Sequence, residues 1–441
     1  MVAIVAWLAI ALAIAMFGLP LGHDEAAYAL EARGGGPDWL YRSSGMIAIA
    51  RLGVAMGGSE LAMRLPSALL GAGFVAAVWA MGRRAFGETT GAWAAAVIAG
   101  THPMVLRAPE LLGDLPGAAC ILAGAAVLVG ELSARPPSWR LLLAAPAFAG
   151  AFYFRYGSAP VILIVCGVAA VLWWRELLAR PLIVLATVGL CAALVIPHLI
   201  QSQQATGSLL GILDVSAGMP RRAYVGEGLV TYLTSNPFRF YGALAPVVMI
   251  AGLASLVRPP AHWRPTIFVA AVALGQLVAI GLQSHGQPRY VYFATALLVV
   301  LGVDAIRRAA IARPRLAYPR VALAVVGAAW LGVAIALPAY RNRIADERGP
   351  VFAAGEAIRA DAAGAPCLVI ARVVPQLAWY SRCETILERT LADAGAIAPH
   401  SYVVSLPGFA TTVEPIATAT HATATPLPTG DPRAVVWRLA P

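Results

Sequence analysis

The chain alternates between long apolar runs and short connections that are rich in arginine. A helix needs about 20 apolar residues to cross the hydrocarbon core of a bilayer. Two of the runs, 141–154 and 158–174, are separated only by a short interruption at Arg155. The pattern is typical of a polytopic all-α membrane protein. It predicts about eleven transmembrane helices, at residues 2–20, 62–82, 90–106, 115–133, 141–154, 158–174, 181–200, 239–257, 265–283, 290–306 and 320–338.

Three longer polar stretches lie between or after these runs. The connections at about 21–61 and about 201–238 are predicted to be external loops with helices of their own. The sequence therefore divides into a transmembrane domain, 1–338, and a small soluble α/β domain, 339–441. The α/β prediction rests on strand-like runs and one helical pattern, at Cys367–Ala371, Tyr402–Leu406 and Val435–Leu439 for the strands and Phe352–Ala360 for the helix.

Pairs and runs of arginines occupy alternate short connections between the predicted spans. The positive-inside rule assigns such a side to the cytoplasm. We therefore expect an inner-membrane protein with a cytoplasmic N-terminus and an extracytoplasmic α/β domain. The first apolar run lacks a preceding basic region, so it is predicted to be a retained helix rather than a cleaved signal peptide. With eleven spans the cytoplasmic arginines are Arg83, Arg84, Arg135, Arg140, Arg175, Arg180, Arg258, Arg264, Arg307, Arg308, Arg313, Arg315 and Arg320.

Composition excludes a soluble protein and changes the meaning of the net charge. Of the 441 residues, 60% are hydrophobic and only 12% are charged, whereas soluble domains carry about 25% charged residues. The formal net charge is +10, and all 32 basic residues are arginine because the chain contains no lysine. A basic chain often binds nucleic acid. Here the membrane topology accounts for many of the arginines, so no nucleic-acid partner is expected.

A pair of acidic residues, Asp24 and Glu25, directly follows the first span. Ionisable groups at membrane depth are costly, so their presence suggests a function. One carboxylate can act as the general base for a hydroxyl, while the second orients the substrate or raises the pKa of the first. Alternatively, Asp24 is the N-cap of an amphipathic helix that runs through Tyr28. The pair alone does not decide between these interpretations.

Further ionisable and aromatic residues gather at helix ends on the same predicted side as Asp24. A single arginine at a helix end normally extends its guanidinium to the interface. Several clusters that face one compartment indicate a pocket instead. Arginine binds phosphate oxygens in a bidentate manner, so this pocket would suit a substrate that carries phosphate. The clustered residues are Arg107, Asp114, Arg155, Tyr156, His285, Arg289 and Tyr290.

In their order and spacing these residues resemble the GT-C class of membrane glycosyltransferases. The nearest groups are the bacterial relatives of protein O-mannosyltransferases and of lipid A aminoarabinose transferases. The chain departs from them at Arg42-Ser43-Ser44 and Arg155-Tyr156-Gly157, where members often have Lys-Pro-Pro and Lys-Gly-Pro. These differences affect the identity of the donor more than the class of the enzyme. The similar features, within about residues 1–310, are Asp24-Glu25 with Tyr28, Arg64–Leu69, Gly82–Gly87, Asp114 and Arg289-Tyr290.

The resemblance implies inverting transfer of a sugar from a polyprenyl-phosphate donor to a hydroxyl at the outer membrane surface. Asp24 would take the proton of the acceptor hydroxyl. Glu25 and Asp114 would position the acceptor or the sugar, or hold a divalent cation if one is used. The donor phosphate would be held by Arg42, Arg155 and Arg289, and the other implied substrate contacts are Tyr28, Arg64, Arg107, Tyr156, His285 and Tyr290.

Other functions fit part of the pattern. A lipid-linked sugar flippase or transporter would place polar groups near the bilayer midplane, often in repeated halves, but here they gather at helix ends and no repeat is visible. A polysaccharide polymerase or ligase would use a similar donor, and a non-catalytic scaffold would leave the acidic residues unexplained. The sugar stays open, as does the acceptor, which is a lipid, a glycan or a protein.

Two cysteines, Cys367 and Cys383, lie in the predicted extracytoplasmic domain. Disulfides persist in such a compartment. The two residues form either a disulfide or a pair of buried thiols.

Overall fold

The computed structural model describes residues 1–34, 42–133, 137–218, 222–257, 263–312, 318–388 and 400–440. The predicted cytoplasmic residues Arg135, Arg258, Arg313 and Arg315 lie outside these ranges. The chain forms two compact units, which we call the membrane unit and the loop–sheet unit. The membrane unit comprises Met1–Ile14, Leu40–Ile49 and Leu65–Leu337, and the loop–sheet unit comprises Ala15–Trp39, Ala50–Arg64 and Pro338–Pro441.

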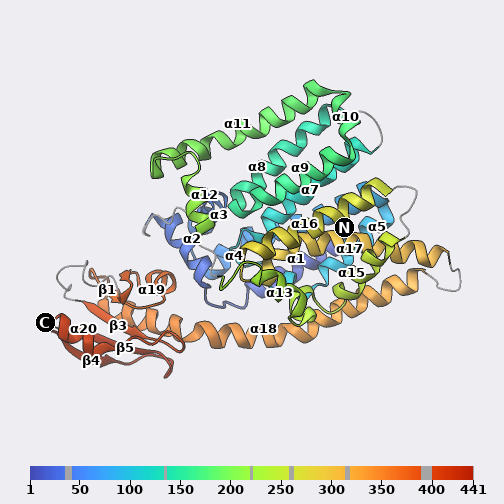
Figure 1. The fold of residues 1–441 in the computed structure, drawn as a ribbon. Coiled ribbons are helices and arrows are strands. Elements are labelled where there is room, and N and C mark those ends of the chain that lie inside the picture. Colours follow the sequence, from blue (N-terminus) through green and yellow to red (C-terminus); the bar gives the residue numbers. More distant parts are fainter. Residues whose placement is uncertain are drawn as a thin grey trace. The chain divides into compact units, whose positions relative to one another are not determined.

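Each predicted span contains a helix (Figure 1). Within the described ranges, six helices are long and apolar enough to cross a membrane, and five shorter apolar helices accompany them. The multi-pass architecture is therefore confirmed, while the count of eleven stays a prediction. One of the five shorter helices, Ser44–Ala55, lies in the first long polar stretch and not in a predicted span. The helices inside the predicted spans are α1 (Val2–Ala15), α4 (Glu60–Phe86), α5 (Glu88–Ala99), α7 (Asp114–Leu132), α8 (Ala144–Phe154), α9 (Ala159–Leu172), α11 (Pro181–Thr206), α15 (Ala245–Ala254), α16 (Trp263–Gln283), α17 (Tyr292–Ile311) and α18 (Tyr318–Ala362).

Shorter helices lie in the connections. The predicted loop helices are present in both long polar stretches. At the end of the second polar stretch, the short helix α14 (Pro237–Tyr241) stops at Gly242. The φ angle of Gly242 is 84°, which suits glycine but few other residues. The span predicted at 239–257 therefore begins only at Ala245. The connecting helices are α2 (His23–Arg33), α3 (Ser44–Ala55), α6 (His102–Val105), α10 (Trp174–Leu178), α12 (Gly211–Gly218), α13 (Glu227–Thr234) and α14 (Pro237–Tyr241).

Helix α17 forms the centre of the membrane unit. Every residue from Tyr292 to Asp304 is buried, so neighbouring helices cover all sides of this segment. The backbone of α15 comes very close to it, because a Cβ on Gly252 would lie 2.8 Å from the amide nitrogen of Gly302. A short 3₁₀ turn, η4 (Pro288–Val291), precedes α17 and carries two of the predicted site residues.

The loop–sheet unit contains a five-stranded sheet in the order β2-β1-β3-β5-β4. The first three strands in this order are parallel, and β5 pairs antiparallel with both β3 and β4. The predicted strands at 367–371, 402–406 and 435–439 are confirmed; the sequence did not indicate β2 or β4. The strands are β1 (Leu368–Ile370), β2 (Glu384–Ile386), β3 (Ser401–Ser405), β4 (Thr423–Leu427) and β5 (Val435–Ala440).

Alternation of side chains along the strands builds a core on each face of the sheet. Val369 and Tyr402 point to one face, where they pack against the C-terminal part of α18 and against α19 (Val374–Ser381). Leu368 and Val403 point to the other face, which α20 (Val413–Ala419) covers. The helix predicted at 352–360 is thus the end of α18, which continues without a break from the last predicted span.

Candidate functional site

The predicted residues divide between the two units. Asp24, Glu25, Tyr28 and Arg64 lie in the loop–sheet unit. The membrane unit contains Arg42, Arg107, Asp114, Arg155, Tyr156, His285, Arg289 and Tyr290.

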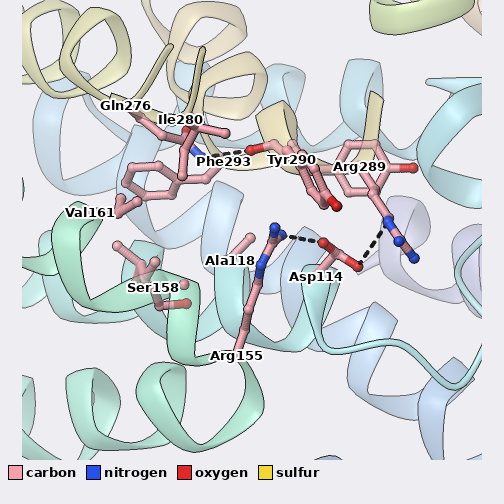
Figure 2. Close-up of a pocket in the computed structure, with 13 residues that line it drawn as sticks. Asp114, Ala118, Arg155, Ser158, Val161, Gln276, Ile280, Arg289, Tyr290 and Phe293 are labelled. Carbon is pink, nitrogen blue, oxygen red and sulfur yellow. Dashed lines mark hydrogen bonds and ion pairs between the residues drawn. The ribbon is translucent and has the colours of Figure 1, made fainter. Parts of the chain in front are cut away.

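In the membrane unit, Asp114 connects two arginines that are far apart in sequence (Figure 2). Asp114 is the first residue of α7, and Arg155 lies in extended conformation where α8 ends. The Arg155 guanidinium donates to one Asp114 carboxylate oxygen, and the Arg289 Nε lies 3.9 Å from the other. Three breaks between helices therefore place one carboxylate between two cations.

The ring of Tyr290 completes this cluster. The guanidinium carbon of Arg155 lies 4.6 Å from the ring centroid, and that of Arg289 lies 5.5 Å from it. Such cation–π contacts hold a guanidinium in place without using its N–H donors. His285 packs edge-on against the same ring at 6.0 Å between centroids. The Tyr290 main-chain oxygen accepts from Gln276 Nε2 at 2.9 Å, which ties η4 to α16.

A second ion pair, Arg107 with Glu110, lies close by. The Arg107 Nε donates to a Glu110 carboxylate oxygen at 2.6 Å, and Glu110 is almost completely buried. The negative charge of Glu110 raises the pKa of Arg107, so this guanidinium stays charged at every accessible pH. Both residues line a small depression together with Asp114 and Arg289. Among the described residues that line this depression and a neighbouring pocket, three arginines thus face two carboxylates.

The neighbouring pocket, which is partly open to solvent, is lined by Asp114, Arg155 and Arg289. Besides these charges and Tyr290, the pocket has an apolar part, formed by Ile121, Val161, Ile280 and Phe293, and two polar side chains, Ser158 and Gln276. An anion with an apolar extension matches this combination of charged and apolar lining. Gln276 and Tyr292, which also lines the pocket, were not predicted. A glutamine within an apolar span was the available signal for the first of them.

Tyr156 anchors the segment that carries Arg42. Its hydroxyl accepts from the Ser44 amide at 3.2 Å, and its ring packs against Phe152 and His198 at 5.3 and 4.7 Å between centroids. Tyr156 is therefore buried and supports the segment just after Arg42. This geometry favours a positioning role for Tyr156 over the expected substrate contact.

In the loop–sheet unit, Glu25 is the centre of a buried ion network. It is the third residue of α2, and its carboxylate accepts from the Gly22 amide at 2.7 Å, as in a capping box. Arg64 donates to both of its oxygens at 3.1 Å, and Arg348 donates to one at 2.9 Å. Burial alone would raise the pKa of Glu25, but the positive charges of Arg64 and Arg348 lower it from 4.5 to about 2.

Arg64 also supports the chain before α2. Its Nη1 donates to the Leu19 carbonyl at 2.5 Å, and its Nη2 donates to the Pro20 carbonyl at 3.1 Å. With Glu25 as a further acceptor, at least four of the five N–H donors of the guanidinium are used inside the unit. The structure thus favours a positioning role for Arg64 and Glu25 rather than the expected substrate contacts. Arg348, on α18, was missed because nothing in its local sequence distinguishes it.

Asp24 lies beside Glu25 but in a different environment. Glu25 is only 2% exposed, whereas Asp24 is half-buried at the second position of α2. The N-cap is Gly22, so the alternative that Asp24 itself caps the helix does not hold. Tyr28 follows one helical turn later and is buried. Of the acidic pair, Asp24 is therefore the more exposed residue.

Metal ligands were left open by the sequence. Within the described ranges, no group of three or more His, Cys, Asp or Glu side chains is arranged to hold a metal ion. The cysteines of the α/β region, Cys367 and Cys383, are joined in a disulfide, the first of the two alternatives.

Comparisons with known proteins agree on one fold. A sequence search of curated proteins finds no significant match, but the profile of the dolichyl-phosphate-mannose-protein mannosyltransferase family matches residues 45–201. ArnT from Cupriavidus metallidurans, solved in the apo state and bound to undecaprenyl phosphate, superposes over 98% of this chain and 97% of its own, with a TM-score of 0.72 and 15% identity. The oligosaccharyltransferase AglB from Archaeoglobus fulgidus, in complex with an inhibitory peptide and a dolichol-phosphate, covers 91% of this chain and 69% of its own, with a TM-score of 0.55 and 12% identity. These likenesses confirm the predicted fold class, a polytopic membrane protein with a small C-terminal α/β region.

Proposed function

We propose that this protein, which has the fold of the GT-C membrane glycosyltransferases, transfers a sugar from a polyprenyl-phosphate donor to a hydroxyl acceptor. The acceptor is a lipid, a glycan or a protein side chain. The arginine distribution places the N-terminus in the cytoplasm, so that transfer takes place at the outer face of the inner membrane. The transmembrane domain, 1–338, would carry the catalysis, and 339–441 would be extracytoplasmic.

The observation that carries the proposal is the cluster of Arg155, Tyr290 and Arg289 around Asp114. Guanidinium groups bind phosphate oxygens in a bidentate manner, and here the tyrosine ring holds two of them in place. The adjacent pocket has both a charged and an apolar part, as a phosphate on an isoprenoid chain requires. A solved structure of the same fold is bound to undecaprenyl phosphate.

The proposed reaction is a single displacement. Asp24 removes the proton of the acceptor hydroxyl as its oxygen forms a bond to the anomeric carbon. The bond between that carbon and the donor phosphate oxygen breaks, and the electron pair leaves with the polyprenyl phosphate. Arg155 and Arg289, with Arg42, stabilise the charge that develops on the leaving phosphate. Because the acceptor attacks opposite the leaving group, the anomeric configuration inverts.

Purified protein in nanodiscs, incubated with radiolabelled undecaprenyl-phosphate sugars and membrane extract, tests this function. Label should move to a new product with the wild type and not with Asp24→Asn, because a general base contributes about 10²–10⁴ in rate. The exposed Asp214 on α12 gives a matched control, and Asp214→Asn should transfer normally. Near-normal transfer by folded Asp24→Asn would refute the assignment. Movement of intact donor across a liposome bilayer without transfer would instead favour a flippase.

A further inference from the structure

The α/β region makes direct contacts with the helix that carries Asp24. All of these contacts lie within the loop–sheet unit. Three residues of the C-terminal region make contacts of defined geometry there: Arg348 on α18, and Trp379 and Tyr380 on α19. None of the three was indicated by the sequence.

Tyr380 holds the segment that leads into α2. Its hydroxyl accepts from the Leu21 amide at 2.7 Å and donates to a Glu60 carboxylate oxygen at 3.1 Å. The side chain is almost fully buried. Burial, with the nearby Glu60 charge, raises the pKa of Tyr380, so the hydroxyl keeps its proton and can serve both partners. One hydroxyl thus fixes Leu21, three residues before Asp24.

Arg348 makes a second contact with the same segment. Its Nη1 donates to the Pro20 carbonyl and to Glu25, each at 2.9 Å. A Cβ on Gly22 would lie 2.9 Å from its Nη2, so the guanidinium lies directly against the backbone there. Arg348 therefore contacts residues on both sides of Asp24 in the sequence, including its immediate neighbour Glu25.

Trp379 holds the other end of α2. The guanidinium carbon of Arg33, in the last turn of that helix, lies 3.6 Å from the Trp379 ring centroid. Tyr380 in turn packs edge-on against Phe352 of α18 at 5.0 Å. A Cβ on Gly355 would overlap that of Tyr380, so the glycine lets α18 and α19 touch. Both ends of α2 are consequently held by neighbouring residues of α19.

The disulfide closes the loop that contains α19. Cys367 lies directly before β1 and Cys383 directly before β2, and α19 connects these two strands. The bridge limits how far β1, α19 and β2 can separate. Its reduction would leave only non-covalent contacts to hold α19 in place.

We propose that Tyr380 and Arg348 are positioning residues for Asp24, and that the Cys367–Cys383 disulfide maintains their position, so that transfer depends on the oxidised bridge. This rests on the proposed function, in which Asp24 is the base. A general base must lie within hydrogen-bond reach of its proton, and a displacement of about 1 Å can cost on the order of 10²-fold in rate. Neither residue needs to touch the donor. The effect should therefore fall on kcat and leave the donor KM unchanged.

The test compares Tyr380→Phe with Tyr402→Phe. Tyr402, on β3 of the same unit, is also a buried tyrosine, but its hydroxyl donates at 2.7 Å to Asp361, an acceptor on α18 and not in the segment before α2. Tyr380→Phe should lower kcat by about tenfold or more, with the donor KM unchanged, and should speed hydrogen exchange of peptides that cover 19–33. Tyr402→Phe should change none of these. Dithiothreitol should reproduce the effect on the wild type and add little to Tyr380→Phe.

Three results would overturn the proposal. The first is unchanged hydrogen exchange at 19–33 in both Tyr380→Phe and the reduced wild type. The second is an unchanged kcat of Tyr380→Phe. The third is that dithiothreitol lowers the kcat of Tyr380→Phe by the same factor as that of the wild type. A wild type without transferase activity would instead refute the proposed function. In that case the hydrogen-exchange comparison alone still decides whether α19 holds α2.

Discussion

Adjacent carboxylates, Asp24 and Glu25, should respond in opposite ways to removal of their charge. Glu25→Gln keeps the size of the side chain but replaces one acceptor oxygen by a donor. That NH₂ group would face the Gly22 amide or the guanidiniums of Arg64 and Arg348, which are donors themselves. Arg64 and Arg348 would then lose the carboxylate charge that Glu25 supplies. Removing one partner of a buried ion pair costs about 3–5 kcal/mol.

The lowered pKa of Glu25 gives a second value for the stability that this ionised carboxylate contributes. A carboxyl whose pKa falls from 4.5 unfolded to about 2 folded contributes about 3 kcal/mol of stability. Because the folded value is the lower one, this contribution is complete above about pH 5 and is lost as the pH falls towards 2. It should fall to less than half by about pH 3.

Thermal unfolding in detergent, followed by tryptophan fluorescence at several pH values, measures this effect. At pH 7 Glu25→Gln should unfold well below the wild type, and the gap should narrow as the pH falls from 5 to 3. Asp24→Asn, at the half-buried neighbour, should change the free energy of unfolding by only about 0.5 kcal/mol and yet abolish transfer. A Glu25→Gln protein as stable as the wild type at pH 7, or a stability difference that does not depend on pH, would contradict this role of Glu25.

Three further predictions concern the membrane unit. Arg155→Gln should raise the donor KM by about 10–100-fold, because a hydrogen bond to a charged group contributes about 1.5–3 kcal/mol. Steady-state kinetics over a series of donor concentrations measures this KM, and an unchanged value would exclude Arg155 from the phosphate site. Tyr290→Leu should raise the same KM by about fivefold or more, because two cation–π contacts of about 0.5–1 kcal/mol each are lost. Tyr290→Phe keeps the ring and should behave like the wild type, so equal effects of the two substitutions would contradict a role for the ring. Gly113→Ala should lower the free energy of unfolding by about 1–3 kcal/mol, because the new Cβ would overlap the Phe154 carbonyl oxygen. Gly167 has open space around it, so Gly167→Ala should be neutral in the same melting experiment.

The hydrophobic pattern alone predicted most of the helical architecture. Each apolar run contains a helix, because a backbone in hydrocarbon must satisfy its hydrogen bonds within the segment. The limits of the helices were harder to predict. The first span was expected to reach residue 20, but α1 ends at Ala15, and Gly18 with φ of 61° follows. At the other end of the chain, α18 passes through Pro338, where the sequence indicated a boundary.

The α/β region shows which local signals are too weak. Strands β1, β3 and β5 were visible because they are apolar and β-branched. Strand β2, Glu384–Ile386, contains only one apolar residue, and β4 is mostly exposed and contains Pro426. Their pairing depends on neighbours that are distant in sequence, so the run of residues itself does not specify it.

For the candidate site, the sequence by itself determined which residue types cluster at helix ends. Burying an ionisable group is costly, and this cost makes Asp24, Asp114, Arg155 and Arg289 conspicuous in an apolar chain. Only the tertiary structure decided which partners each of them has. Glu25 and Arg64 look like substrate contacts in the sequence, but folding brings Arg348 to them from more than 280 residues further on and encloses all three charges. A side chain's partners depend on which segments meet in space, and that information is not present in the local sequence.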